Sequence, residues 1–324
     1  MNILKMFVPS ENALEYLGSL TSIPADIPMK YGFVLAIVFT VWRYVFQFLG
    51  AKFFVRIIDP AKDREQRAYK ASESAFKFFY YLFSWLWAVV IIVDLGIWTD
   101  TLKCIQDWPY KESYSINAYI LWELAFYVSA LGCHFTIETR RKDFVEMLVH
   151  HVVTIFLIVS CIVFRLQRIG VLVLAVHDVA DIVLEAGKMA NYVNSSAGGS
   201  VVFFGLLLVV WVISRLYYFP VKVIRAVYFE HYLMFNSPYC QYFTGVLCIL
   251  LVLHLYWTKL IIKTFYKYLT TGKTKDARED FEHDEGSGGG GDEKKRIWRP
   301  TVLQWQNSVH DITCYQRGVL VLVL

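Results

Sequence analysis

Charged residues are scarce along most of this chain. It holds 32 Lys or Arg and 28 Asp or Glu residues among 324, so 19% of its residues are charged, whereas soluble domains carry about 25%. Fifteen of these charges lie between residues 273 and 299, which leaves the rest of the chain poorer still. The chain is also 56% hydrophobic. This composition excludes an intrinsically disordered protein, argues against an ordinary soluble globule, and predicts that the apolar surface faces lipid.

Several other signals are missing. The net charge of +4 is too small and too diluted by acidic residues to predict a nucleic-acid partner. The six cysteines form no CxxC pattern and no close pair, so we expect small buried apolar side chains rather than a disulfide framework. The N-terminus has no charged segment followed by an apolar core, so we expect no cleaved signal peptide. The first apolar segment is then expected to serve as its own signal.

The sequence does contain long apolar segments, each near the roughly 20 residues that a membrane helix needs. There are seven of them, at about 31–51, 77–98, 116–135, 144–164, 169–190, 201–220 and 241–263. The fifth also carries five acidic, basic or imidazole side chains, and such a segment spans a bilayer only if those groups face other helices or a polar cavity. We therefore predict an all-α, polytopic membrane protein with about seven transmembrane helices.

Lysine and arginine predict the orientation of these helices, because they concentrate in cytosolic segments. Seven lie between residues 52 and 77, three are consecutive at Arg140, Arg141 and Lys142, and five lie between residues 259 and 275. Seven spans with this bias place the N-terminus in the lumen and the C-terminus in the cytosol. The Asn194-Ser195-Ser196 sequon is then cytosolic and is expected to stay unmodified. The polar, glycine-rich segment beyond residue 270 is typical of a flexible tail.

Two clusters of titratable residues stand out, because lipid makes such groups costly. His150 and His151 are adjacent in the fourth span, and His177, Asp178 and Asp181 follow in the fifth. His177, Asp181 and Glu185 share one stripe of a helix, since residues four apart lie on the same face. At 1.5 Å per residue, His150 lies about 9 Å and Asp181 about 13–14 Å from the cytosolic ends of their helices. The two clusters are therefore expected to meet in the cytosolic half of the membrane.

Three kinds of chemistry fit these clusters. They can form a polar network that only joins two helices. They can bind a metal such as zinc or iron, although adjacent histidines point about 100° apart on a helix and chelate poorly together. They can carry out acyl transfer, because a neutral imidazole is a good nucleophile or base near pH 7 and a carboxylate fixes its tautomer. Spacing alone does not choose among them.

The stretch from Glu138 to Tyr192 resembles the Lag motif of ceramide synthases of the Lag1 type, within the TRAM-Lag1-CLN8 (TLC) domain family. The resemblance rests on RRKDF, on the HH pair, on R-x-G-x-L-V-L-x-x-H-D-x-x-D and on LEAGKMANY. SESAFKFFYYL upstream and RLYYFP and GKTKDARED downstream are similar to the start and the close of that domain. Only about 25 residues separate the first two spans, so the chain resembles the members without a homeobox-like domain.

The resemblance implies an enzyme of the endoplasmic reticulum that N-acylates a sphingoid base from acyl-CoA, with no cofactor and no metal. It implies a cavity enclosed by about six spans and an acyl chain carried covalently on His150. His151, His177, Asp178 and Asp181 complete the implied active site. The family's acyl-length specificity is attributed to the loop here at about 221–240. Apart from the resemblance, Arg140, Arg141 and Lys142 flank the expected cytosolic mouth, where they either bind CoA phosphates or serve only as a positive-inside anchor. The expected partners are acyl-CoA, a long-chain base, the bilayer, and a second identical or related subunit.

The expected organisation is a lumenal tail at 1–30, a first span with a basic cytosolic loop at 31–71, the TLC domain at 72–270, and a cytosolic tail at 271–324. Two other functions remain open. One is a non-catalytic, lipid-sensing or translocation-associated member of the same domain family, which would be marked by loss of the HH or HDxxD residues. The other is a seven-helix receptor, which would have its ligand pocket on the outer side.

Overall fold

The structure, a computed structural model, describes residues 26–271 except for gaps at 61–62, 106–107, 109–111, 139–142, 194–197 and 232–237. The described residues are helical apart from short connections and contain no strand, which confirms the predicted all-α fold. Several predictions fall outside this part of the chain. They concern the tail before residue 26, the tail beyond 271, Arg140, Arg141 and Lys142, the sequon at Asn194, and residues 232–237 of the loop expected to set acyl length.

The long helices follow the expected order of spans. They are α2 (Asp26–Ile57), α3 (Arg64–Leu95), α4 (Tyr114–Thr136), α5 (Phe144–Val163), α6 (Gln167–Val193), α7 (Gly198–Trp211) and α9 (Pro238–Thr271). A short 3₁₀ turn, η2 (Thr101–Cys104), precedes α4, and η3 (Val212–Ile224) and η4 (Ala226–His231) continue α7. All seven expected spans therefore correspond to helices.

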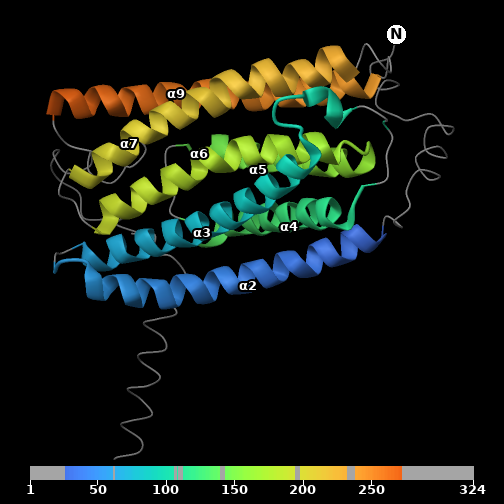
Figure 1. Ribbon diagram of the computed structural model, residues 1–324. Coiled ribbons are helices and arrows are strands. Elements are labelled where there is room, and N and C mark those ends of the chain that lie inside the picture. Colours follow the sequence, from blue (N-terminus) through green and yellow to red (C-terminus); the bar gives the residue numbers. More distant parts are fainter. Residues whose placement is uncertain are drawn as a thin grey trace, which may run out of the picture.

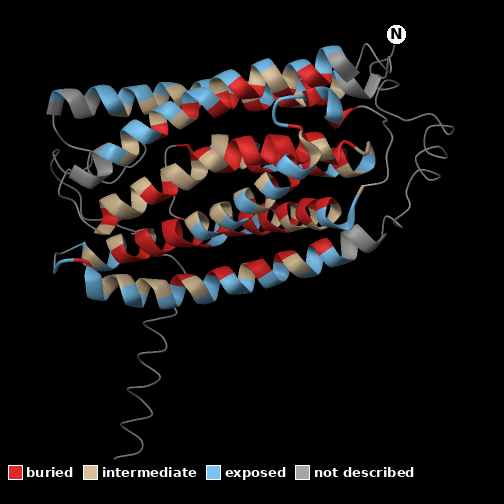
Figure 2. Ribbon diagram, viewed as in Figure 1, coloured by how far each residue is buried: buried red, intermediate tan, exposed pale blue. Residues whose placement is uncertain are grey.

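The helices run side by side (Figure 1), and α3, α4, α5, α6, α9 and the α7–η3 segment form a ring that lines one cavity. α6 packs on α3, α7 and η3, α9 packs on η3 and α5, and α4 packs on α5 and α3. α2 lies outside this ring and contacts α3 and α4. Buried residues are most numerous on α3, α4 and α6, whereas α2 and α9 expose much of their outer surface (Figure 2). The exposed apolar side chains of those outer surfaces suit contact with lipid.

Among the residues that the structure describes, six segments are long and apolar enough to cross a membrane: α2, α3, α4, α5, α7 continued through η3 and η4, and α9. α6 does not meet that test, because its 27 residues include Arg168, Asp178, Asp181, Glu185 and Lys188. Its position explains how these charges are accommodated, since α6 is packed by helices of the ring and keeps most of its first half buried. A charged helix in that place spans through protein contacts rather than through lipid.

Two elements differ from the sequence-based expectation. α3 begins at Arg64 rather than near residue 77, so the expected basic loop shrinks and Arg64, Arg67 and Lys70 lie on helical turns. α7 does not end at residue 220 but continues as a π-helical segment through Pro220. Proline has no N–H to donate, and a wider helical turn adjusts the backbone around it. Arg215 lies on these widened turns and is buried.

Side-chain bonds close the end of the bundle at which α4 begins. Arg168 at the start of α6 pairs with Glu112 at 3.1 Å, and its guanidinium also donates to the carbonyl of Lys103. The indole of Trp108 donates to the carbonyl of Phe164 at 2.9 Å, and Tyr218 donates to the carbonyl of Trp98 at 2.6 Å. These bonds tie the connection before α4 to α5, α6 and η3, so the interior opens toward the other end.

Candidate active site

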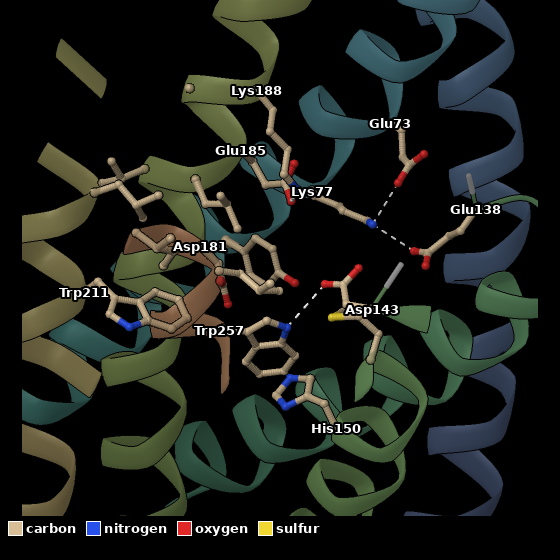
Figure 3. A pocket seen from close by; sticks show the side chains of 18 of the residues that line it. Glu73, Lys77, Glu138, Asp143, His150, Asp181, Glu185, Lys188, Trp211 and Trp257 are labelled. Atoms are coloured by element: carbon tan, nitrogen blue, oxygen red, sulfur yellow. Dashed lines mark hydrogen bonds and ion pairs between the residues drawn. The ribbon is translucent and has the colours of Figure 1, made fainter. Parts of the chain in front are cut away.

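A cavity of about 220 Å³ lies at the open end of the bundle, between the six helices of the ring. α3, α4, α5, α6, α9 and the α7–η3 segment all contribute to its lining, which confirms the expected central cavity. Figure 3 shows the polar side chains that converge on it, among them His150, Asp143, Asp181 and Lys77. Apolar side chains from α7 and α9 form much of the opposite wall.

His150 is buried on α5 and lies where two cavities meet. It lines the large cavity and also a second, narrow one. Its ring stands edge-on to that of Trp257 with centres 5.4 Å apart, and lies 6.2 Å from the ring of Tyr127. Nδ1 of His150 is buried without a hydrogen-bond partner, which leaves Nε2 as the nitrogen open to the cavity. A histidine placed in this way can present a lone pair to a ligand.

The second cavity extends from the histidines toward the closed end of the bundle. It measures about 20 Å³, and His150, His177 and Tyr127 lie at one end of its lining. The remaining lining is almost wholly apolar and includes Ile120, Thr154, Leu157, Ile158, Cys161, Gly170, Val173, Leu174, Phe243, Leu247 and Leu250. At present width it holds little more than a water molecule, so a hydrocarbon chain would have to part these side chains.

His151 lies beside a buried ion-pair cluster that the sequence analysis did not identify. Both ring nitrogens of His151 are buried without partners, and its ring lies 5.6 Å from that of His134. Nδ1 of His134 lies 3.0 Å from Glu138, and Glu138 also accepts from Arg43 and Lys77, each at 2.8 Å. Burial alone would raise the pKa of Glu138, but Lys77 and Arg43 outweigh it and hold that pKa well below its usual range.

His134, Glu138 and His151 together have the spacing of a metal site, since one ligand atom from each lies within 4.8 Å of the others. Their surroundings do not suit a divalent cation. His134 faces acceptors with both nitrogens, Glu138 at Nδ1 and the carbonyl of Phe144 at Nε2, each 3.0 Å away. Glu138 already balances two cationic side chains. We therefore describe the cluster as an ion-pair network, and the expected absence of a metal stays a prediction.

The second expected cluster, on α6, is held by Arg215 of η3. The guanidinium of Arg215 donates to Asp181 at 2.7 Å and to the carbonyl of His177 at 3.1 Å. It also lies 4.5 Å from the ring centre of Trp211. Asp178 points elsewhere: it is fully buried, and neither carboxylate oxygen has a hydrogen-bond partner. The five expected residues thus lie in one interior, with Asp181 on the large cavity and His177 on the narrow one.

Comparison with known proteins identifies the family. The model of the TLC domain matches residues 70–263. Ceramide synthase LOH2 of Arabidopsis thaliana is 35% identical over 256 residues, which cover 75% of this chain and 86% of the relative. This chain belongs to the ceramide synthase family of TLC-domain proteins. ASC1-like protein 1 of Oryza sativa subsp. japonica is similar at 32% identity, and the match covers 80% of this chain and 89% of the relative. Ceramide synthase hyl-2 of Caenorhabditis elegans is similar at 28% identity, and the match covers 75% of this chain and 80% of the relative.

The TLC domain includes further site residues that the sequence analysis did not single out. They are His134 on α4, Arg215 on η3, and His254 and Trp257 on α9. His134, Arg215 and His254 carry the same signal as the expected residues, a titratable or cationic side chain within a segment that spans lipid. Trp257 carries none, because tryptophan is common in such helices. Arg43 lies before the TLC domain, on α2, and yet its side chain reaches Glu138 inside it.

Proposed function

We propose that this chain is a ceramide synthase that transfers a fatty acyl group from acyl-CoA to the amine of a long-chain base through an acyl-imidazole on His150. One observation carries the proposal: His150 lies at the junction of a large cavity, on which polar side chains converge from one side, and a narrow apolar one. An acyl donor has the same division, with a polar carrier on one side of its carbonyl and a hydrocarbon chain on the other. The family to which the chain belongs supports the same activity.

The first step forms the acyl-enzyme. Nε2 of neutral His150 attacks the thioester carbonyl, the C–S bond breaks, and CoA leaves as the thiolate. The proton of the other ring nitrogen is released, so that the products are CoA thiol and a neutral acyl-imidazole. The apolar ring of Trp257 against His150 keeps water away from this intermediate.

The second step transfers the acyl group. The neutral amine of the base attacks the acyl carbonyl, the C–N bond to His150 breaks, and an amide forms. A base must take the proton that the amine loses and pass it to His150, which leaves without its ring proton and returns to neutral imidazole. His151 suits this role, because both of its nitrogens are without partners and its neighbours are His134 and Glu138. Asp181 and Arg215 hold the α6 cluster in place rather than contacting the reacting atoms.

The cavities suggest where each substrate lies. The narrow cavity would take the acyl chain, and the apolar wall of the large cavity, which includes Phe203, Leu207 and Leu260, would take the hydrocarbon of the base. Arg140, Arg141 and Lys142, which follow α4 in the sequence, would bind CoA phosphates. Removing their charges should raise the KM for acyl-CoA more than the KM for the base, and equal effects on both would contradict this role. No cofactor is needed, because acyl-CoA brings its acyl group already activated.

We place the chain in the membrane of the endoplasmic reticulum, with the N-terminus in the lumen and the C-terminus in the cytosol. The distribution of Lys and Arg supports this orientation, since both basic segments and the C-terminal flank then face the cytosol. An N-terminal tag should be protected from protease in sealed microsomes, and glycosylation at Asn194 would contradict the arrangement. A second identical or related subunit is part of the proposal, and mass photometry of the detergent-solubilised protein tests it.

The decisive experiment measures the intact mass of the purified protein after incubation with acyl-CoA alone. We expect an adduct of the acyl mass in the parent and none in His150→Ala. In His151→Ala, amide formation should slow by about 10²–10⁴, the range for loss of a general base, while the adduct still forms. An adduct that survives in His150→Ala would overturn the nucleophile assignment. A parent that makes no amide with any acyl-CoA and long-chain base would favour the non-catalytic member of the family.

A further inference from the structure

His254 lies in the middle of α9 and is fully buried. Its ring is enclosed by His177 of α6, Phe219 of η3 and Trp211 of α7, with ring centres 4.8, 5.1 and 6.2 Å away. Nε2 of His254 lies 3.0 Å from Nε2 of His177. The two histidines therefore form a direct link between α9 and α6, although 77 residues separate them in the chain.

The partners of His177 fix the protons of this pair. Nδ1 of His177 lies 2.6 Å from the carbonyl of Val173, and a carbonyl only accepts, so that Nδ1 carries a proton. Nε2 of a neutral His177 then has only a lone pair, and the proton between the rings belongs to His254. His254 is thus the donor, and its own Nδ1 is buried without a partner. Both nitrogens of His177 are occupied within the protein, so His177 is not the base that meets the amine.

A histidine at such a position is costly, because its polar atoms are withdrawn from water inside an apolar helix. An apolar residue of similar size would fill the space between Phe219 and Trp211 without that cost. The hydrogen bond to His177 is the interaction that sets histidine apart from an apolar residue here.

The link lies next to the proposed nucleophile. Trp257 follows His254 by three residues and so shares its face of α9, and its ring meets that of His150. On the other side, the carbonyl of His177 accepts from Arg215. The pair therefore sets the distance between α9, which carries Trp257, and α6, which carries Asp181.

We propose that His254 is a positioning residue of the acyl-transfer reaction, which locks α9 to α6 through His177 and thereby holds Trp257 against His150. This inference rests on the proposed function. It assigns His177 to the same lock, where it receives the hydrogen bond of His254 and touches neither the thioester nor the amine through a free nitrogen. A glutamine at position 254 can still donate a proton to His177, whereas a leucine cannot.

The test compares His254→Gln, His254→Leu, His177→Leu and the double Leu variant in detergent. A lost buried hydrogen bond costs about 1–3 kcal/mol, so His254→Leu should lower kcat roughly 5- to 150-fold and leave both KM values unchanged. His254→Gln should keep most of the parent kcat. The double Leu variant should lose no more than the worse single variant, because the two rings act as one unit. Leu253→Ala, a buried change next to His254 but outside both cavities, is the control for simple loss of packing.

The outcomes separate this inference from the proposed function. If the parent makes amide and His254→Leu does so equally well, or if the two single losses multiply in the double variant, the positioning role is wrong and the activity stands. If the parent makes no amide, the proposed function fails, and the melting temperatures of the same four variants still test the link. Additive losses in melting temperature would then contradict it, as would a glutamine variant no better than leucine.

Discussion

The indole of Trp257 stands edge-on to the imidazole of His150, with ring centres 5.4 Å apart and an angle of 83° between the planes. Nε1 of the same indole donates to Asp143 at 3.3 Å, so the indole is held by this hydrogen bond as well as by its contact with His150. The tryptophan thus covers the residue that would carry the acyl group.

Removing this cover should uncouple the two steps of transfer. In Trp257→Ala we expect water to reach the acyl-imidazole, so that CoA is released without an equal amount of amide. Trp257→Phe keeps a ring against His150 and loses only the bond to Asp143, so it should stay more tightly coupled. The measurement is the ratio of free thiol to amide product, and an unchanged ratio in Trp257→Ala would contradict the covering role.

Gly170 should help to set the acyl length. A Cβ at this position would lie 3.0 Å from Sγ of Cys161 and 3.2 Å from Cδ1 of Ile120, both in the lining of the narrow cavity. Gly170→Val should therefore fill the far end of that cavity and shift the preference toward shorter acyl-CoAs, whereas Ile120→Ala should shift it toward longer ones. A competition assay with an equimolar mixture of acyl-CoAs gives the product ratios. Shifts in the same direction in both variants would rule out this cavity as the acyl site.

Replacing one partner of the Arg215–Asp181 pair should destabilise the protein more than replacing both partners with apolar residues. Arg215→Met leaves the carboxylate of Asp181 without its partner, and such losses cost about 3–5 kcal/mol in buried pairs. Replacing both residues with apolar ones should recover much of the folded yield, measured by size-exclusion chromatography in detergent, without restoring activity. Arg215→Lys should give a folded yield between those of the parent and of Arg215→Met, because an ammonium keeps the charge but lacks the planar fork that reaches two acceptors. A double variant less stable than Arg215→Met would contradict the expectation.

Glu138 should contribute stability that does not change across the neutral and mildly acidic range. Its pKa is held well below the usual value, so its contribution is complete above the unfolded pKa of about 4.3 and is lost only as pH falls toward the folded pKa. Glu138→Gln leaves Arg43 and Lys77 buried without a carboxylate and should lower the melting temperature. The difference from the parent should be the same at pH 7.5 and pH 5.5. If the difference in melting temperature between the parent and Glu138→Gln is smaller at pH 5.5 than at pH 7.5, Glu138 takes up a proton in that range and the expectation is wrong.

Much of the fold could be predicted because lipid imposes simple rules on sequence. Runs of apolar residues located all seven helices, and the cost of charge in lipid located His150, His151, His177 and Asp181 in one interior. The rule works on one residue at a time and says nothing of partners. It could not show that Arg215 pairs with Asp181, because the two residues are 34 apart in the chain and meet only through the packing of η3 on α6. Nor could it give the extra turns of α3, whose charged residues look like a loop in the sequence.

The bond between Arg43 and Glu138 joins a helix that precedes the TLC domain to a loop within it. A boundary drawn at residue 70 separates the two partners of a buried ion pair, so α2 is more than an interchangeable membrane anchor. A recombinant in which another protein's first helix is fused to this domain would have to bring its own cation to the same depth. Exchanges between relatives should therefore succeed when the crossover lies ahead of α2, and fail when it lies between α2 and α3 and the incoming helix has no cation at that depth.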